Sequence, residues 1–232
     1  MKEYIKKTLL CIVPLLFAGS VLFANDIYVT QSGDTLDLDI TQDGQNNTVG
    51  NSTTASSSTG ATTTLNIDQV GNSNVITYQI NGATYTGVIN LVGNSNNVDL
   101  NCDSTGNNSS CGTANAVINF TGNSNDIDLD IGQTSSANNA DVDIVGQSGS
   151  DSNVVAATVD GNSAILTITV NGDTNNWLID MDGNGDINGH TLIHTHTGGL
   201  ADVDIVQSGV NDQMITLTTS GDNHDIDIQQ TD

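Results

Sequence analysis

The stretch Gln69-Val-Gly71-Asn-Ser-Asn74-Val-Ile-Thr-Tyr-Gln-Ile80 decides the fold, because versions of it recur along the chain. In each version a short polar segment with a glycine and an asparagine precedes alternating apolar and polar residues. Side chains of a strand alternate between its two sides, so the apolar residues of each copy share one face. Each copy therefore predicts a strand, a tight turn at the glycine and a second strand.

The turn glycines set the register of the repeat. The residue four positions before the glycine is isoleucine in most copies, as at Ile67, Ile89 and Ile118. We expect the glycine to adopt a positive φ, and the asparagine to hydrogen-bond the local backbone. One copy, near residue 149, carries an inserted residue. The predicted turn glycines are Gly44, Gly71, Gly93, Gly122, Gly149, Gly172 and Gly209.

A single repeat cannot bury its apolar side alone, whereas stacked repeats build a continuous core between two sheets. The sequence therefore predicts an all-β fold, a parallel β-solenoid of strand-turn-strand repeats with two packed sheets. We expect a single domain over residues 25–232, made of about seven or eight irregular repeats. The spacing of the turn glycines is uneven, and we expect the additions to form loops at 50–64, 103–113 and 182–199.

The N-terminal residues 1–24 are typical of a secretory signal peptide. Lys2, Lys6 and Lys7 precede an apolar run that ends in small residues near Ala24. The run is too short and wrongly flanked for a membrane-spanning helix. The sequence thus predicts a secreted or surface-exposed bacterial protein, with no membrane insertion once the signal is removed.

The charge of the chain is strongly negative. The formal net charge is −24, and all 27 acidic residues except Glu3 are aspartates. The three lysines lie inside the predicted signal peptide, so the exported chain has no Lys or Arg. Nucleic acids and anionic membranes are therefore excluded as electrostatic partners. Without a cationic side chain or a supported Ser-His-Asp arrangement, we expect no enzymatic activity, no catalytic residues and no cofactor.

Two cysteines remain in the exported part of the chain. Cys102 and Cys111 lie in a segment rich in Gly, Asn and Ser. In an oxidising exterior such a pair predicts a disulfide that closes a loop, and two free thiols are the alternative.

One segment has the spacing of a calcium loop, in which oxygen ligands alternate around a central glycine. Its twelfth position is Thr191 rather than glutamate, and no helices flank it, so a polar connection between repeats is the competing interpretation. The candidate Ca²⁺ ligands are Asp180, Asp182, Asn184, Asp186 and Asn188.

The histidines and threonines allow two further interpretations. His190, His194 and His196 could bind a transition metal, or be solvated strand residues. Thr-x-Thr pairs could face ice, or be exposed strand formers, which the pattern favours. These pairs occur at Thr62 and Thr64, Thr167 and Thr169, Thr195 and Thr197, and Thr216 and Thr218.

The repeated Gln-x-Gly-x-x-Asn, followed by two alternating apolar positions, resembles the repeat of curlins, the subunits of bacterial curli fibres. The resemblance covers nearly all of residues 25–232. It implies export to the cell surface and head-to-tail polymerisation, with itself or with related curlin-like subunits, into amyloid-like fibres for adhesion and biofilm matrix. Two departures are aliphatic residues at Ile80 and Ile131, where curlins usually carry an inward glutamine, and the uneven repeat period.

Three functions follow as hypotheses: a fibre subunit, a monomeric surface adhesin, and a Ca²⁺-responsive or ice-facing binding module. The ends of a solenoid carry unpaired backbone groups that invite pairing. The two terminal segments, 34–43 and 222–232, are crowded with aspartate, so we expect like charges to meet at a head-to-tail joint. Salt or Ca²⁺ should then assist association.

Overall fold

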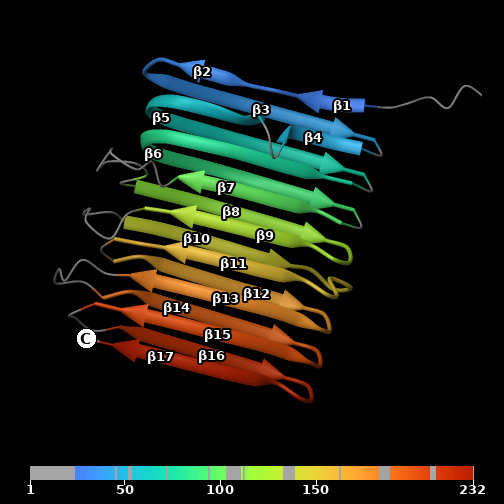
Figure 1. Cartoon of the computed structure of the whole chain (residues 1–232), viewed down its shortest axis with the longest axis vertical. Coiled ribbons are helices and arrows are strands. Elements are labelled where there is room, and N and C mark those ends of the chain that lie inside the picture. The colour runs from blue at the N-terminus through green and yellow to red at the C-terminus, as the bar shows by residue number, and fades with distance from the viewer. Residues whose placement is uncertain are drawn as a thin grey trace, which may run out of the picture.

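The computed structural model describes residues 24–44, 46–51, 54–71, 73–93, 95–102, 111, 113–132, 139–161, 163–182, 189–209 and 213–231. These residues form strands, turns and bends with no helix, so none of them belongs to a helix long and apolar enough to cross a membrane. The chain coils into a stack of strands, as Figure 1 shows. The prediction of an all-β parallel solenoid is confirmed.

The strands form two parallel stacks, which we name sheet 1 and sheet 2. Sheet 1 contains β3 (Thr35–Asp43), the later parts of β5 (Thr54–Val70) and β6 (Val75–Val92), β8 (Thr113–Thr121), β10 (Asn139–Gly146), β12 (Ile165–Asn171), β14 (Thr191–Thr197) and β16 (Met214–Ser220). Sheet 2 contains β1 (Ala24–Ile27), β2 (Thr30–Ser32), β4 (Asn46–Asn51), the earlier parts of β5 and β6, β7 (Asn97–Cys102), β9 (Asp126–Ile131), β11 (Val154–Val159), β13 (Asn175–Asp182), β15 (Ala201–Ser208) and β17 (Asp225–Thr231).

The two stacks meet at two edges. At the first edge sheet 1 strands turn into sheet 2 strands, and at the second edge sheet 2 leads back to sheet 1. Tight turns of the first edge follow one another along the right side of Figure 1. β5 and β6 run continuously around the second edge, and they link both stacks into one hydrogen-bonded sheet. The only antiparallel pairing in the described residues joins Gly50 and Asn51 of β4 to the start of β5.

Inward side chains stack in register and form the core. The isoleucine column runs through Ile67, Ile89, Ile118, Ile144 and Ile168, all buried. Large residues are balanced by small ones in the same column. A Cβ added to Gly146 would lie 2.6 Å from Phe120 Cζ, so the phenylalanine ring occupies the space that the glycine leaves.

Buried asparagines line the interior of the first edge, three positions after the turn residue. Asn96 Nδ2 donates to Asn125 Oδ1 over 2.5 Å, Asn125 to Asn153 over 2.6 Å, and Asn153 to Asn175 over 2.7 Å. Nδ2 of Asn125 also donates to the Gly122 carbonyl at 2.6 Å. The predicted bond from asparagine to local backbone is present, and the continuous ladder between layers was missed.

At several turns glycine is required because the backbones of neighbouring layers lie too close together for a Cβ atom. A Cβ added to Gly71 would lie 1.9 Å from the Gly44 carbonyl oxygen, and one on Gly172 would lie 2.0 Å from that of Ser150. Neither glycine has a φ in the left-handed region. In the turn of Gly172 the positive φ falls instead on Thr174 (59°), the residue before the asparagine, and Ser124 (58°) holds the same position in the turn of Gly122. The predicted positive φ is thus wrong for Gly71 and Gly172, whereas Gly122 (132°), Gly149 (84°) and Gly209 (143°) do have it.

Two predicted turn glycines lie elsewhere than expected. At Gly149 nothing lies within 4 Å of an added Cβ, and φ is +84°, whereas Ser150 stacks on Gly172. The insertion is thus the two-residue bulge of Ser148 and Gly149, not one residue. Gly209 follows β15, whose Ile205 pairs with Ile179 of β13, so it lies at the second edge. Gly198 and Gly221 occupy the equivalent first-edge turns.

Two of the expected loops are largely strand. Thr54–Val70 is β5, and Thr191–Thr197 is β14, which pairs with β12 and β16. The third, 103–113, lies mostly outside the described residues, as do the predicted signal peptide before Ala24 and residues 183–188. These strands were missed because serine, threonine and histidine fill inward positions that the apolar pattern assigns to aliphatic residues.

Candidate functional site: the open ends of the solenoid

The last described layer has a partner on one side only. β16 pairs with β14, and β17 pairs with β15. Their inward side chains are less covered than the core above them: Ile215, Leu217 and Ile226 are half-buried, and Ile228 is 48% exposed. The C-terminal end therefore presents an incomplete apolar layer beside unpaired strand edges.

The first described layer is incomplete in the same way. Within the described residues β3 pairs only with β5, and β1 only with β4. The inward Ile27, Leu36 and Leu38 are partly buried and pack against the core from one side. Within the described part of the chain, both ends of the stack thus combine an apolar strip with backbone groups that no neighbouring strand pairs.

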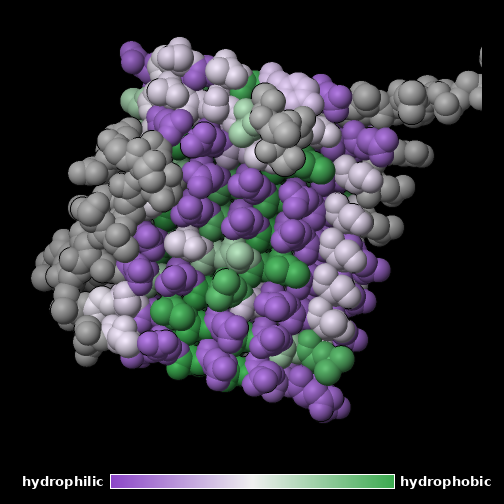
Figure 2. All heavy atoms as spheres, in the orientation of Figure 1, coloured by the Kyte–Doolittle hydropathy of each residue, from purple (hydrophilic) through white to green (hydrophobic). Residues whose placement is uncertain are grey.

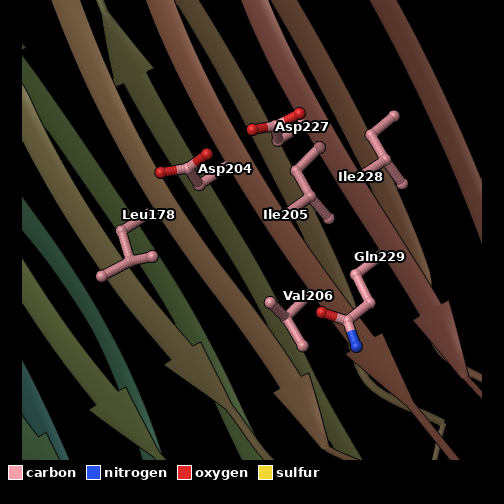
Figure 3. A pocket seen from close by; sticks show the side chains of 7 residues that line it. All are labelled: Leu178, Asp204, Ile205, Val206, Asp227, Ile228 and Gln229. Atoms are coloured by element: carbon pink, nitrogen blue, oxygen red, sulfur yellow. The ribbon is translucent and has the colours of Figure 1, made fainter.

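A surface depression of about 470 Å³ lies on sheet 2 close to the C-terminal end. Figure 3 shows Asp204 and Asp227 side by side on neighbouring strands, which agrees with their register pairing. Leu178, 53% exposed, lies across the depression from Ile228. The lining is Leu178, Asp204, Ile205, Val206, Asp227, Ile228 and Gln229.

A second depression, of about 490 Å³, lies over β6, β7, β9 and β11. Asp99 and Asp128, which pair in register, both line it. Burial raises the pKa of Asp128, and the charges of Asp99 and Asp126 raise it further. In Figure 2 hydrophilic side chains cover most of the broad face turned to the viewer, with hydrophobic ones exposed between them.

Asparagine separates many of the outward aspartates. Asn66 Nδ2 donates to Asp39 Oδ1 over 2.8 Å, and Asn90 Nδ2 donates to Asp68 Oδ1 over 2.6 Å. These pairs join strands of neighbouring layers, so an amide donor replaces a repelling carboxylate in the ladder. The composition indicated an acidic surface, but only the register reveals which aspartates are paired with amides.

The three histidines for which metal binding was one of two interpretations are core residues. His194 and His196 point inward from β14, His190 lies directly before this strand, and all three are at most 2% exposed. The interpretation as solvated strand residues was therefore wrong. His194 packs edge-to-face on Trp177 with ring centroids 5.0 Å apart, and His196 packs on His224 at 5.3 Å. Burial lowers the pKa of all three, to about 4 for His194.

The candidate calcium residues are only partly described. Asp180 and Asp182 lie at the end of β13, while Asn184, Asp186 and Asn188 lie outside the described residues. Asp160, directly after β11, accepts a hydrogen bond from the Asp182 backbone N–H at 3.3 Å. Burial above all raises the pKa of Asp160 to about 7; the hydrogen bond from the Asp182 backbone opposes the rise, and the charges of Asp182, Asp180 and Asp130 add to it. In the described parts of the chain no three His, Cys, Asp or Glu side chains are placed to bind a metal.

Cys102 and Cys111 are joined by a disulfide, with Cα atoms 5.9 Å apart. Both are buried. The bond ties the end of β7 to the residues before β8 at the second edge. The Cys111 backbone N–H also donates to the Gly82 carbonyl at 2.6 Å. The disulfide therefore holds the end of β7 close to the start of β8, which are separated by ten residues in the sequence.

Over the described residues the chain forms a stack whose first and last layers are paired on one side only, with an acidic exterior and columns of polar side chains in the core. No known family model, curated protein or solved structure matches the chain.

Proposed function

We propose that the protein is a secreted structural solenoid of the curlin type, whose copies join end to end at the bacterial surface in cell adhesion and biofilm matrix. The observation that carries the proposal is the correspondence between the last layer and the first. When the internal register is extended by one layer, β16 of one copy adjoins β3 of the next, and β17 adjoins β1 and β2. The strands remain parallel and the coil continues.

The apolar columns match across this joint. Ile215 stacks on Leu38, Leu217 on Ile40, and Ile226 on Ile27. Burial of such side chains contributes about 1.5–3 kcal/mol each before the costs of association are subtracted. The half-exposed residues at both ends would thereby become ordinary core residues.

A glutamine column also continues through the joint. Within the chain, Gln69 Nε2 donates to Gln42 Oε1 over 2.6 Å, and Gln230 Nε2 donates to Gln207 Oε1 over 3.1 Å. In the extended register Gln31 of the next copy follows Gln230. Its amide would donate to Gln230 Oε1, which repeats the direction of the internal pairs.

Charge opposes the joint less than the composition suggests. In the extended register the outward Asp37 and Asp39 adjoin Met214 and Thr216 rather than aspartates. Asp26 and Asp225 are the described carboxylates that meet. We therefore expect salt or Ca²⁺ to speed association mainly by screening the overall negative charge of the chain.

The test places a charge on the end surface and on a matched internal site. Ile228→Lys introduces a lysine into the joint, whereas Leu178→Lys changes a residue of similar exposure, 53% against 48%, on the outer side of an internal layer. We expect the secreted protein and Leu178→Lys to form Thioflavin-positive fibres that grow from seeds, and Ile228→Lys to stay monodisperse by sedimentation. Equal assembly of both variants, or a monodisperse secreted protein at every salt concentration, overturns the proposal.

A second function is favoured by the outer side of β12, β14 and β16. Thr169, Thr195 and Thr218 stand in register there, and the outward residues of these three strands include no acid. A regular, uncharged array of hydroxyl and methyl groups suits an ice surface better than a cationic or an anionic partner. Thermal hysteresis of the secreted protein, lost in Thr195→Lys and kept in Asp204→Lys, would support it. Absence of hysteresis would exclude it.

A further inference from the structure

All four histidines of the chain lie in its last layers. His190, His194 and His196 belong to the segment of β14, and His224 lies directly before β17. Each occupies an inward position, and the preceding layers carry alanine, isoleucine or valine there. The inward columns therefore change from non-titrating residues to imidazoles only near the C-terminal end.

Most of the ring nitrogens have no hydrogen-bond partner. The side chains of His194 and His196 are fully buried, and neither ring nitrogen of either residue has a hydrogen-bond partner. His190 Nδ1 accepts a weak bond from the Ala164 backbone N–H at 3.3 Å. A neutral imidazole tolerates such a site, whereas an imidazolium adds a charge and a second donor that the site does not satisfy.

The neighbours of His194 are apolar or aromatic. It stacks between Ile168 of β12 and Leu217 of β16, and its ring lies against Trp177 of β13. His196 raises the cost of charging His194, because both would carry positive charge. No carboxylate contributes to the shift of the pKa of His194.

The surroundings of His196 and His190 include one acid each. His196 stacks between Val170 and Thr219, contacts the ring of His224, and is favoured as a cation only by Asp173 and the Gly198 backbone. His190 stacks between Ala164 and Gln213, and Asp182 favours its charged form. For both, burial outweighs these acids, and the pKa is lowered.

We propose that the histidine layers, β14 to β17, form an acid-sensitive end that opens when its imidazoles are protonated and thereby withdraws the surface onto which the next copy adds. This inference rests on the proposed end-to-end assembly, and it makes the growth of the fibre dependent on pH.

The pH range follows from the sign of the shifts. A histidine whose pKa is lowered by folding leaves stability unchanged above its unfolded pKa of about 6.5, and stability falls as pH drops below that value. For His194, whose pKa in the folded state is about 4, the loss of stability continues until the pH reaches that value. Opening of the last layers should therefore rise between pH 6.5 and 4. The raised pKa values of Asp128, Asp160 and Asp180 act in the opposite sense, because these carboxyl groups favour the folded state in acid.

The experiment measures hydrogen exchange of the monomeric secreted protein at pH 7.5 and pH 5, corrected for the intrinsic exchange rate, together with elongation of preformed seeds. The test variant carries His194→Leu and His196→Val, which match the apolar neighbours in their columns. The control carries Ile168→Leu, which disturbs the same column without changing a titratable group.

At pH 5 we expect exchange in residues 189–231 to rise by about tenfold or more relative to residues 113–161. Elongation should fall by a similar factor in the secreted protein and in Ile168→Leu, and by less than about twofold in the histidine double variant. Uniform exchange at both pH values, or an unchanged acid response in the double variant, overturns the acid-sensitive end. If no fibres form at either pH, the assembly proposal fails, and the acid-regulated growth that rests on it fails too. The exchange data then still decide whether acid opens this end.

Discussion

The interior of the solenoid contains polar side chains both in the half up to β13 and in the half from β14 onward. The two halves differ in how these side chains are hydrogen-bonded. Up to β13 the inward polar residues are mainly amides that hydrogen-bond to the next layer, as Gln69 does to Gln42. From β14 onward some inward columns hold imidazoles, beside the hydrogen-bonded pair Gln207 and Gln230. His196 lies in the column of Gln42 and Gln69 without a partner for either nitrogen. A stack can thus accept polar interior residues in two ways, and only the second makes its stability depend on pH.

The largest loss of stability is expected from Gly172→Ala, which interrupts the stack between the two halves. Gly172 lies in the turn between β12 and β13, and a Cβ there would lie 2.0 Å from the Ser150 carbonyl oxygen. Because backbone must move, Gly172→Ala should cost about 3 kcal/mol or more in the free energy of unfolding. Thermal melting should become biphasic, since the layers on either side no longer share a continuous stack.

Gly149→Ala is the matched control for that experiment. Gly149 lies in the bulge, with φ of +84° and open space around an added Cβ. Only backbone strain opposes the methyl group, so the cost should be about 1–2 kcal/mol with a single transition. Equal destabilisation by the two variants would contradict the stacking explanation for the turn glycines.

The next effect tests the amide half directly. Asn125 donates to Asn153 and accepts from Asn96, so Asn125→Leu leaves buried amide groups short of partners on both sides. We expect a loss of about 2–3 kcal/mol, measured by urea unfolding. Asn119→Leu changes a half-exposed asparagine on the outer side of the neighbouring strand and should stay within about 0.5 kcal/mol. A similar cost for both would mean that the buried ladder adds nothing.

A smaller loss of stability is expected from variants of the pair Gln42 and Gln69. These variants test whether the hydrogen bond stabilises the fold or only satisfies two buried polar groups. Gln69→Leu alone removes the donor to the buried Gln42 Oε1 and should cost about 1–2 kcal/mol. Gln42→Leu combined with Gln69→Leu replaces both partners by apolar groups, so the double variant should be less destabilised than the sum by about 1 kcal/mol. Strict additivity in a double-mutant cycle would show that the two amides are independent.

The difference between the halves also explains what the sequence could and could not predict. Ile67 and Ile118 were placed correctly because strand alternation needs only local pattern. The inward histidines of β14 were missed because a His-Thr alternation looks like an exposed strand until its register with Ile168 is known. Ser150 was missed as a turn residue for the same reason, since only stacking on Gly172 identifies it. Features that arise between layers carry no signal within one repeat.

The smallest effect concerns Asp160, a titratable group close to the boundary between the halves. Its raised pKa of about 7 means that the folded state binds the proton more tightly than the unfolded state, whose carboxyl titrates near 3.8. Stability is therefore unaffected below that lower value, declines as pH rises toward 7, and stays reduced above it. Asp160→Asn keeps an acceptor for the Asp182 backbone N–H and removes the charge. After allowance for solvent screening, the gain at pH 8 should not exceed about 1 kcal/mol, and it should vanish near pH 4. A gain of equal size at both pH values would assign the effect to packing instead, and it would remove Asp160 from the titrating groups that distinguish one region of the stack from another.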